Sequence, residues 1–189
     1  MRRLAHRLGT LALVLVTLAV GGYLLHVADD WTADRPFEVR GDFAQRVHGR
    51  QFDATGVRVR CAAKLKLGEA ILDTQGVWVI AKIRAVAGDR TTHIGWSALR
   101  DGRGRTFLTS DRLQQFMLNH DLQPGIPVEG EIVFEVPVDA AGDLTLLLAY
   151  NSLEREMDTM IAIPLPISDV GRLLPDSAPA PVFLPKAVA

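Results

Sequence analysis

The stretch LQPGIPVEGEIVFEVP, residues 122–137, decides the fold class of this chain. From position 128 to position 136 the even residues are apolar or small, and three of the four odd residues are glutamates: Glu129, Glu131 and Glu135. A period of two is typical of a half-buried β-strand, because successive side chains point to opposite faces of a sheet. The pattern predicts that Phe134 lies in a core. It also predicts that the three glutamates face water, where they favour solubility and protect a sheet edge.

Prolines set the limits of this strand. Because proline has no N–H to donate to a ladder, Pro124 and Pro127 are expected to end the preceding loop, and Pro137 to stop the strand.

Other segments repeat the pattern. In residues 56–68, GVRVRCAAKLKLG, the apolar residues share one parity and predict a single buried face: Val57, Val59, Cys61, Ala63, Leu65 and Leu67. Residues 76–88, GVWVIAKIRAVAG, are rich in β-branched residues and predict a central strand covered on both sides. Asp101, Gly102 and Gly104 predict a tight turn between two antiparallel strands.

The remaining segments complete an all-β pattern. Residues 111–119, DRLQQFMLN, place Leu113, Phe116 and Met117 at helical spacing and predict a short helix or loop across one end of the fold. Two further strands are expected at residues 143–151 and 159–165. The prediction is one antiparallel β-sandwich over residues 48–165.

The first 30 residues carry a membrane signal. Residues 8–25 are 18 positions without a charge, and three arginines precede them: Arg2, Arg3 and Arg7. As a helix they would span about 27 Å, close to the roughly 30 Å hydrocarbon core, and basic residues before a span stay in the cytoplasm. We therefore expect a cytoplasmic N-terminus (1–7), one transmembrane helix acting as a signal anchor (8–28) and an extracytoplasmic remainder. Residues 29–47 are a juxtamembrane connector with a short strand at FEVR.

Two alternatives to the anchor exist. One is a cleaved signal peptide, cut within the apolar run or after Ala28, and the other is a buried core helix. No cysteine follows the apolar run, so a lipobox-type lipid anchor is excluded.

The C-terminal residues 166–189 form a proline-rich tail. From Pro164 onward the chain holds six of its ten prolines. This composition favours an extended, mobile and disordered segment over a packed element, and such a segment would space the domain from the wall or contact a partner through PVFLP. The alternative is a tail that packs back on the domain.

The sequence resembles the telokin-like, immunoglobulin-fold domains of bacterial exported proteins, relatives of small secreted mycobacterial immunogenic antigens. The resemblance covers roughly residues 49–164 and lies in four stretches: GRQFDATGVRVR, GVWVIAKIRA, LRDGRGRTF and LQPGIPVEGEIVFEVP. It implies an immunoglobulin-like antiparallel sandwich behind an N-terminal anchor or signal. The loop VAGDRTT, residues 86–92, departs from the usual turn after the central strand, and the resemblance brings no catalytic residues.

Charge and histidine spacing indicate no catalytic, cofactor or metal site. The net charge of −1 gives no basic field for nucleic acid. The five histidines lie far apart without metal-binding spacing: His6, His26, His48, His93 and His120. His120 lies between Asn119 and Asp121, which is typical of a polar loop.

Nucleophile motifs are also missing. Ser97 in IGWSALR lacks the Gly-x-Ser-x-Gly elbow. Cys61, the only cysteine, has apolar parity and is expected to be a small buried hydrophobe. Trp78 and Trp96 are expected in the core, with exposed binding anchors as the alternative.

These observations lead to a function class. The sequence predicts a non-enzymatic, membrane-anchored extracytoplasmic module for contact with an envelope protein or ligand. The first alternative is a secreted soluble protein of the same fold. The second is a cell-envelope hydrolase or metal-dependent enzyme.

Overall fold

A computed structural model describes residues 10, 13–23, 36–110, 112–113, 117–151, 158–167 and 179–188. The chain divides into two compact units, Met1–Arg35 and Pro36–Ala189. In the first unit, residues 13–23 are helical and their large apolar side chains are exposed. Within the described part of the chain, no helix has both the length and the apolar character needed to cross a membrane. Most of the ends of the expected span, residues 8–9, 11–12 and 24–28, lie outside the described residues.

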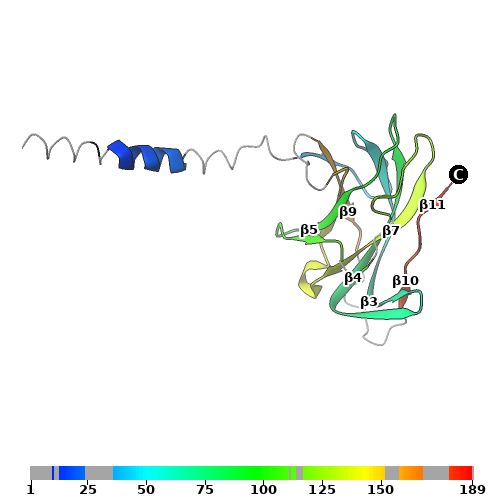
Figure 1. Ribbon diagram of the computed structural model, residues 1–189. Coiled ribbons are helices and arrows are strands. Elements are labelled where there is room, and N and C mark those ends of the chain that lie inside the picture. Colours follow the sequence, from blue (N-terminus) through cyan, green and yellow to red (C-terminus); the bar gives the residue numbers. More distant parts are fainter. Residues whose placement is uncertain are drawn as a thin grey trace, which may run out of the picture. The chain divides into compact units, whose positions relative to one another are not determined.

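The second unit is an all-β sandwich of two sheets, as the sequence predicted (Figure 1). In the order in which its strands pair, the first sheet, sheet A, consists of β1 (Phe37–Arg40), β9 (Thr159–Leu165), β8 (Leu144–Ala149), β5 (Trp96–Asp101) and β6 (Thr106–Leu108). The second, sheet B, consists of β10 (Ala180–Pro181), β3 (Phe52–Leu67), β4 (Ala70–Ala87), β7 (Val128–Val136) and β11 (Lys186–Ala187), with β2 (Val47–His48) also paired to β3. A short 3₁₀ helix, η2 (Val138–Ala140), links β7 to β8.

The pairing is antiparallel except at two edges. β1 pairs in parallel with β9, and β10 pairs in parallel with β3. Because β1 is a strand of sheet A, the sandwich includes residues that the sequence assigned to the connector before residue 48.

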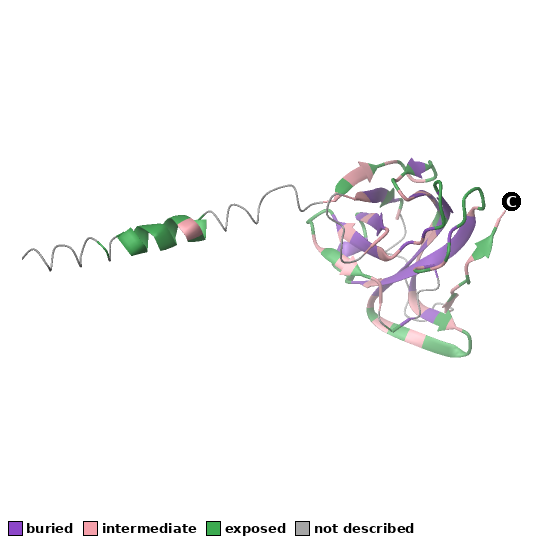
Figure 2. Cartoon of the chain, turned by 45° about the horizontal axis from the view of Figure 1, so that its top comes forward, coloured by how far each residue is buried: buried purple, intermediate pink, exposed green. Residues whose placement is uncertain are grey.

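The main core lies between the sheets (Figure 2). Sheet B contributes Ile132 and Phe134 from β7, and sheet A contributes Leu146 and Leu148 from β8, all of them fully buried. Phe134 has no exposed surface, so the prediction that it lies in the core is confirmed.

The outer face of sheet B holds a second apolar cluster, which comprises Ala62, Leu65, Trp78, Ile80, Leu113 and Val133. Trp78 and Ile80 on β4 stand beside Glu135 and Val133 on β7, whereas the alternate residue Val79 faces the main core next to Phe134. Around Trp78 and Ile80, β4 is therefore covered on both sides, as predicted. Trp78 is fully buried, but in this outer cluster rather than between the sheets.

The predicted single buried face of β3 is wrong. The register with β4 shifts between Gly56 and Arg58 and again between Ala62 and Lys64, so two β-bulges change which parity faces inward. Val57 is consequently exposed, Cys61 packs against the main core, and Leu65 belongs to the outer cluster. At the first bulge the backbone of Gly56 lies against the Phe43 ring, because a Cβ at this position would overlap that ring.

The hairpin turn between β5 and β6 is confirmed. The carboxylate of Asp101 accepts hydrogen bonds from the backbone N–H groups of Arg103 (3.0 Å) and Arg105 (2.8 Å), and Gly104 has the positive φ of 84° that such a turn requires. In the segment predicted as a short helix or loop, the described residues 112–113 and 117–119 form bends and turns. Leu113 and Met117 there are buried, and Phe116 lies outside the described residues.

Candidate binding cleft on sheet B

The sequence named no site residue, but the folded chain gathers charged side chains on the outer face of sheet B. β3 contributes Arg58 and Arg60, β4 contributes Lys82 and Arg84, and β7 contributes Glu129 and Glu131. The register places Lys82 beside Glu131 and Arg84 beside Glu129. Since alternate residues of a strand share a face, cations and carboxylates meet across the strands.

Glu129 is held by two cations. Lys82 Nζ lies 2.5 Å from Glu129 Oε2, and Arg84 donates to Oε1 from Nη2 (2.7 Å) and Nε (3.0 Å). The Glu129 side chain is only 8% exposed. The hydrogen bond from Lys82 is the main cause that holds the pKa of Glu129 below its ordinary value. Burial raises this pKa, and the hydrogen bond from Arg84 lowers it further.

Glu131 connects three parts of the chain. Both of its carboxylate oxygens accept from Arg60 Nη2 at 2.8 Å, and Oε2 also accepts from the backbone N–H of Phe183 at 2.8 Å. Its side chain is 3% exposed. The prediction of a wet glutamate face is therefore wrong for Glu129 and Glu131, because cations from β3 and β4 pair with them and the C-terminal residues cover them.

The C-terminal residues 180–188 form a strap, which we call the C-terminal strap. It begins against one edge of sheet B, where β10 pairs with Leu65 and Lys66 of β3. It ends at the other edge, where β11 pairs with Val128 and Glu129 of β7 (Figure 1). Residues 180–188 are thus extended, as predicted, but they pack back on the domain, so the prediction of a mobile, disordered tail is wrong for them; residues 168–178 lie outside the described residues.

A cleft of about 690 Å³ opens between the C-terminal strap and the sheet. We call it the strap cleft. Its lining residues are Val57, Arg58, Arg60, Lys82, Glu129, Gly130, Glu131, Pro181, Phe183, Leu184 and Lys186. Phe183 and Leu184 are 59% and 63% exposed, so the strap cleft has apolar as well as charged walls. That combination suits a ligand with both apolar and hydrogen-bonding groups.

A second hollow, of about 790 Å³, lies on sheet A. Arg40, Asp42, Arg100 and Thr145 are among its lining residues. Arg100 donates to both carboxylate oxygens of Glu38 (2.7 and 3.0 Å), and this pairing with Arg100, more than that with Arg40, holds the pKa of Glu38 below its ordinary value. Among the residues that the structure describes, no leucine or aromatic side chain lines this hollow, whereas the exposed Phe183 and Leu184 line the strap cleft, so we regard the strap cleft as the stronger candidate site.

The residues weighed for chemistry lie on separate elements. His48 Nδ1 is 3.1 Å from Asp53 Oδ2, the His93 and Tyr150 rings lie tilted against each other with centroids 4.9 Å apart, and His120 lies in the loop before β7. His6 and His26 lie outside the described residues. In the described ranges, no group of three or more metal-ligating side chains comes together.

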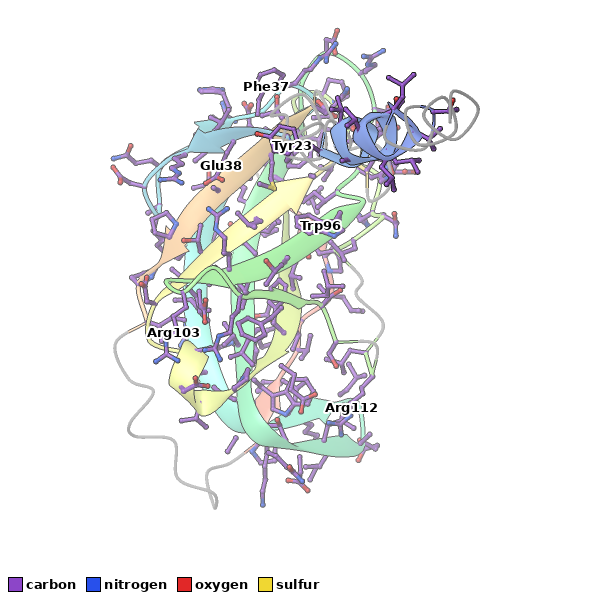
Figure 3. All side chains as sticks on the ribbon, turned by 90° about the vertical axis from the view of Figure 1, so that its left-hand side faces the viewer. Tyr23, Phe37, Glu38, Trp96, Arg103 and Arg112 are labelled. Carbon is purple, nitrogen blue, oxygen red and sulfur yellow. The ribbon has the colours of Figure 1, made fainter. Side chains whose placement is uncertain are left out.

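The surroundings of Cys61, Ser97 and Trp96 indicate that these residues contribute to packing. Burial raises the pKa of the Cys61 thiol to about 11, and Ser97 is 2% exposed on β5. Trp96 is half-buried and packs against Leu147 and Met160 on the outer face of sheet A, not between the sheets (Figure 3). Glu135 accepts from Thr74 Oγ1 and Arg112 Nη1, at 2.5 and 3.5 Å.

Fold and site together define a β-sandwich protein whose own C-terminal strap crosses one sheet. Neither the protein-family models nor the curated proteins give a match to the sequence. Among solved structures, the chain is similar to the yjhA protein of Bacillus subtilis (14% identity, TM-score 0.48, covering 65% of this chain and 98% of that one). It is also similar to MPT63, a secreted protein of Mycobacterium tuberculosis (12%, 0.48, 68% and 97%), and to an uncharacterised β-sandwich protein of Clostridium difficile (8%, 0.46, 71% and 97%). At these identities and TM-scores the likeness carries no information about ligand or activity.

Proposed function

We propose that the protein is a single-pass, membrane-anchored module that presents its sandwich outside the cytoplasm and binds an envelope protein or ligand without catalysis. The observation that carries the proposal is the strap cleft, which joins apolar side chains to buried, paired charges. Binding surfaces commonly combine an apolar centre with a few well-placed polar groups. The sequence resemblance to telokin-like domains of exported proteins is in line with this role.

The anchor is supported by sequence and by exposure. The 18 uncharged residues follow three arginines, and the helical residues 13–23 expose large apolar side chains: Leu13, Val14, Leu15, Val16, Leu18 and Val20. An exposed apolar helix is unfavourable in water but stable in lipid. Tyr23, 69% exposed, has the ring type that favours the headgroup region (Figure 3).

Reporter fusions test the placement. Alkaline phosphatase fused after Ala189 should be active, and the protein should stay in the membrane fraction after a carbonate wash. Activity of a cytoplasmic reporter at the same position would contradict the orientation. A shortened soluble product would instead favour the secreted alternative.

Crosslinked capture from intact membranes tests binding at the strap cleft. Val57→Ser changes an exposed residue of β3 that lines the strap cleft and should reduce capture of the partner at least tenfold. Leu108→Ser is the matched control, because Leu108 is 60% exposed but lies on β6 of sheet A. Equal losses for both variants would contradict the assignment of the site.

We propose binding without catalysis because two candidate nucleophiles are unsuited to react. With a pKa raised to about 11, the Cys61 thiol is protonated at neutral pH, and the Ser97 side chain is buried on β5. Neither group is therefore available as a nucleophile to a substrate in the strap cleft.

A further inference from the structure

The C-terminal strap is held largely through its backbone. Besides the two short ladders, Val182 N–H donates to Lys66 O (3.3 Å) and Val188 N–H donates to Pro127 O (2.9 Å). Between these points, Pro181 O accepts from Arg60 Nη2, and Phe183 N–H donates to Glu131 Oε2. Backbone contacts of this kind give affinity to an extended chain with little dependence on its side chains.

The pair formed by Arg60 and Glu131 acts as a substitute strand edge. In a parallel ladder, one residue bonds a C=O and an N–H that lie on either side of the partner residue. Here Arg60 donates to the C=O of Pro181 while Glu131 accepts from the N–H of Phe183, so the two side chains bracket Val182. Two charged side chains on the face of sheet B thus reproduce the donor and acceptor of an edge strand.

One side chain of the strap adds selectivity. The Arg60 guanidinium lies over the Phe183 ring, 5.6 Å from its centroid, in a cation–π contact. The segment that fits this surface therefore has an accessible C=O, an N–H two residues later and an aromatic side chain on the second of these residues.

We propose that the strap cleft is a receptor for an extended, proline-x-aromatic segment of a partner protein, and that residues 180–188 are a tethered competitor for it. This inference rests on the proposed binding function of the same cleft. The seated strap shows which chemistry the surface accepts, because its own Pro181-Val182-Phe183 occupies the position. A tether of short length gives the strap a local concentration on the order of millimolar, so a free segment competes at a disadvantage.

A binding assay with the full chain in detergent tests this. The probe is a fluorescent peptide of residues 179–188, PAPVFLPKAV, and the proteins are the wild type and Phe183→Pro. The substitution removes the N–H that bonds Glu131 and the ring that lies on Arg60, but changes no residue of β3, β4 or β7. We expect the probe to bind Phe183→Pro at least tenfold more tightly than wild type by fluorescence anisotropy.

A modified peptide is the matched control. N-methylation of the phenylalanine amide removes the donor to Glu131 from the peptide and cannot unfold the protein, so binding to Phe183→Pro should fall at least tenfold. No binding of the unmodified probe to Phe183→Pro, or equal binding of both peptides, would overturn the inference. Concentration-dependent dimers of the wild-type chain, absent in Phe183→Pro, would overturn it in favour of strap exchange between copies.

Failure of this inference and failure of the proposed function give different results. Peptide binding in detergent does not depend on where the domain lies in the cell. Loss of peptide binding with an active phosphatase fusion overturns only the inference. Retained peptide binding with an active cytoplasmic reporter overturns only the proposed placement.

Discussion

Arg60 and Glu131 are 71 positions apart and stand on strands separated by β4, yet Arg60 Nη2 lies 2.8 Å from both carboxylate oxygens of Glu131. The contact requires β3, β4 and β7 to be in register, and the burial of the pair requires the C-terminal strap to be seated, because the strap covers it. The two side chains therefore report at once on the assembly of sheet B and on the occupancy of the strap cleft.

Stability should fall in acid through Glu129. Because the folded-state pKa of Glu129 lies below the ordinary value of 4.5, the unfolded chain takes up a proton at a higher pH than the folded chain does. Its contribution is fully present above about pH 5 and is lost as the pH falls through the folded-state pKa. Thermal melts from pH 7 to pH 3 should show a shallower acid loss for Glu129→Gln than for wild type. Glu69→Gln, in the exposed turn after β3, is the control and should follow wild type.

Phe134→Ala should destabilise the sandwich by about 3–5 kcal/mol, because it removes a fully buried ring from the main core. Phe37→Ala is matched in chemistry, but Phe37 on β1 is 65% exposed and should cost less than about 1 kcal/mol. Urea unfolding of the two variants measures the difference. Similar midpoints for both would show that β7 presents its other face to the core.

Deleting residues 179–189 should lower the free energy of unfolding by about 1–3 kcal/mol. The deletion removes backbone hydrogen bonds at both edges of sheet B and the cover that Ala180 and Val182 give to the cluster around Trp78. Arg60 and Glu131 would remain paired but become solvated. Calorimetry of the shortened chain provides the measurement, and an unchanged melting temperature would mean that the strap does not stabilise the fold.

Cys61 should react slowly. A thiol with a pKa of about 11 in place of 9.0 holds about 100-fold less thiolate at pH 8, and the thiolate is the reactive form. Alkylation by iodoacetamide, followed by mass spectrometry, should be slower by about that factor in the native protein than in urea. Equal rates in the two states would show that the side chain is open to solvent.

The sequence predicted where the strands lie better than which of their faces are buried. The period of β7 and the β-branched run of β4 reflect local rules; β7 formed where expected, and β4 includes the expected run but begins earlier, at Ala70. The alternation of β3 misled because a bulge inserts one residue and exchanges the faces, and only the pairing with β4 reveals it.

The sequence did not predict the candidate site, and the reason again lies in the neighbouring strands. Glutamates at period two indicate a solvated face unless cations stand on the neighbouring strand, as Lys82 and Arg84 do for Glu129. The prolines of the tail favour an extended chain, but proline content does not distinguish an unattached segment from one laid on a sheet. An apolar aromatic group between those prolines, Val182-Phe183-Leu184, was the one local signal that pointed to a contact surface.

The strap also has a consequence for the order in which the protein folds. β10 and β11 follow every other strand of sheet B in the chain, yet they occupy its two opposite edges. Before they arrive, β3 and β7 have unpaired N–H and C=O groups there, which are templates for aggregation between chains. Refolding should therefore pass through an aggregation-prone intermediate that persists until residues 180–188 bind to the two edges. The rate at which these residues bind, more than the free energy that they contribute to the folded state, should then set the yield of soluble protein.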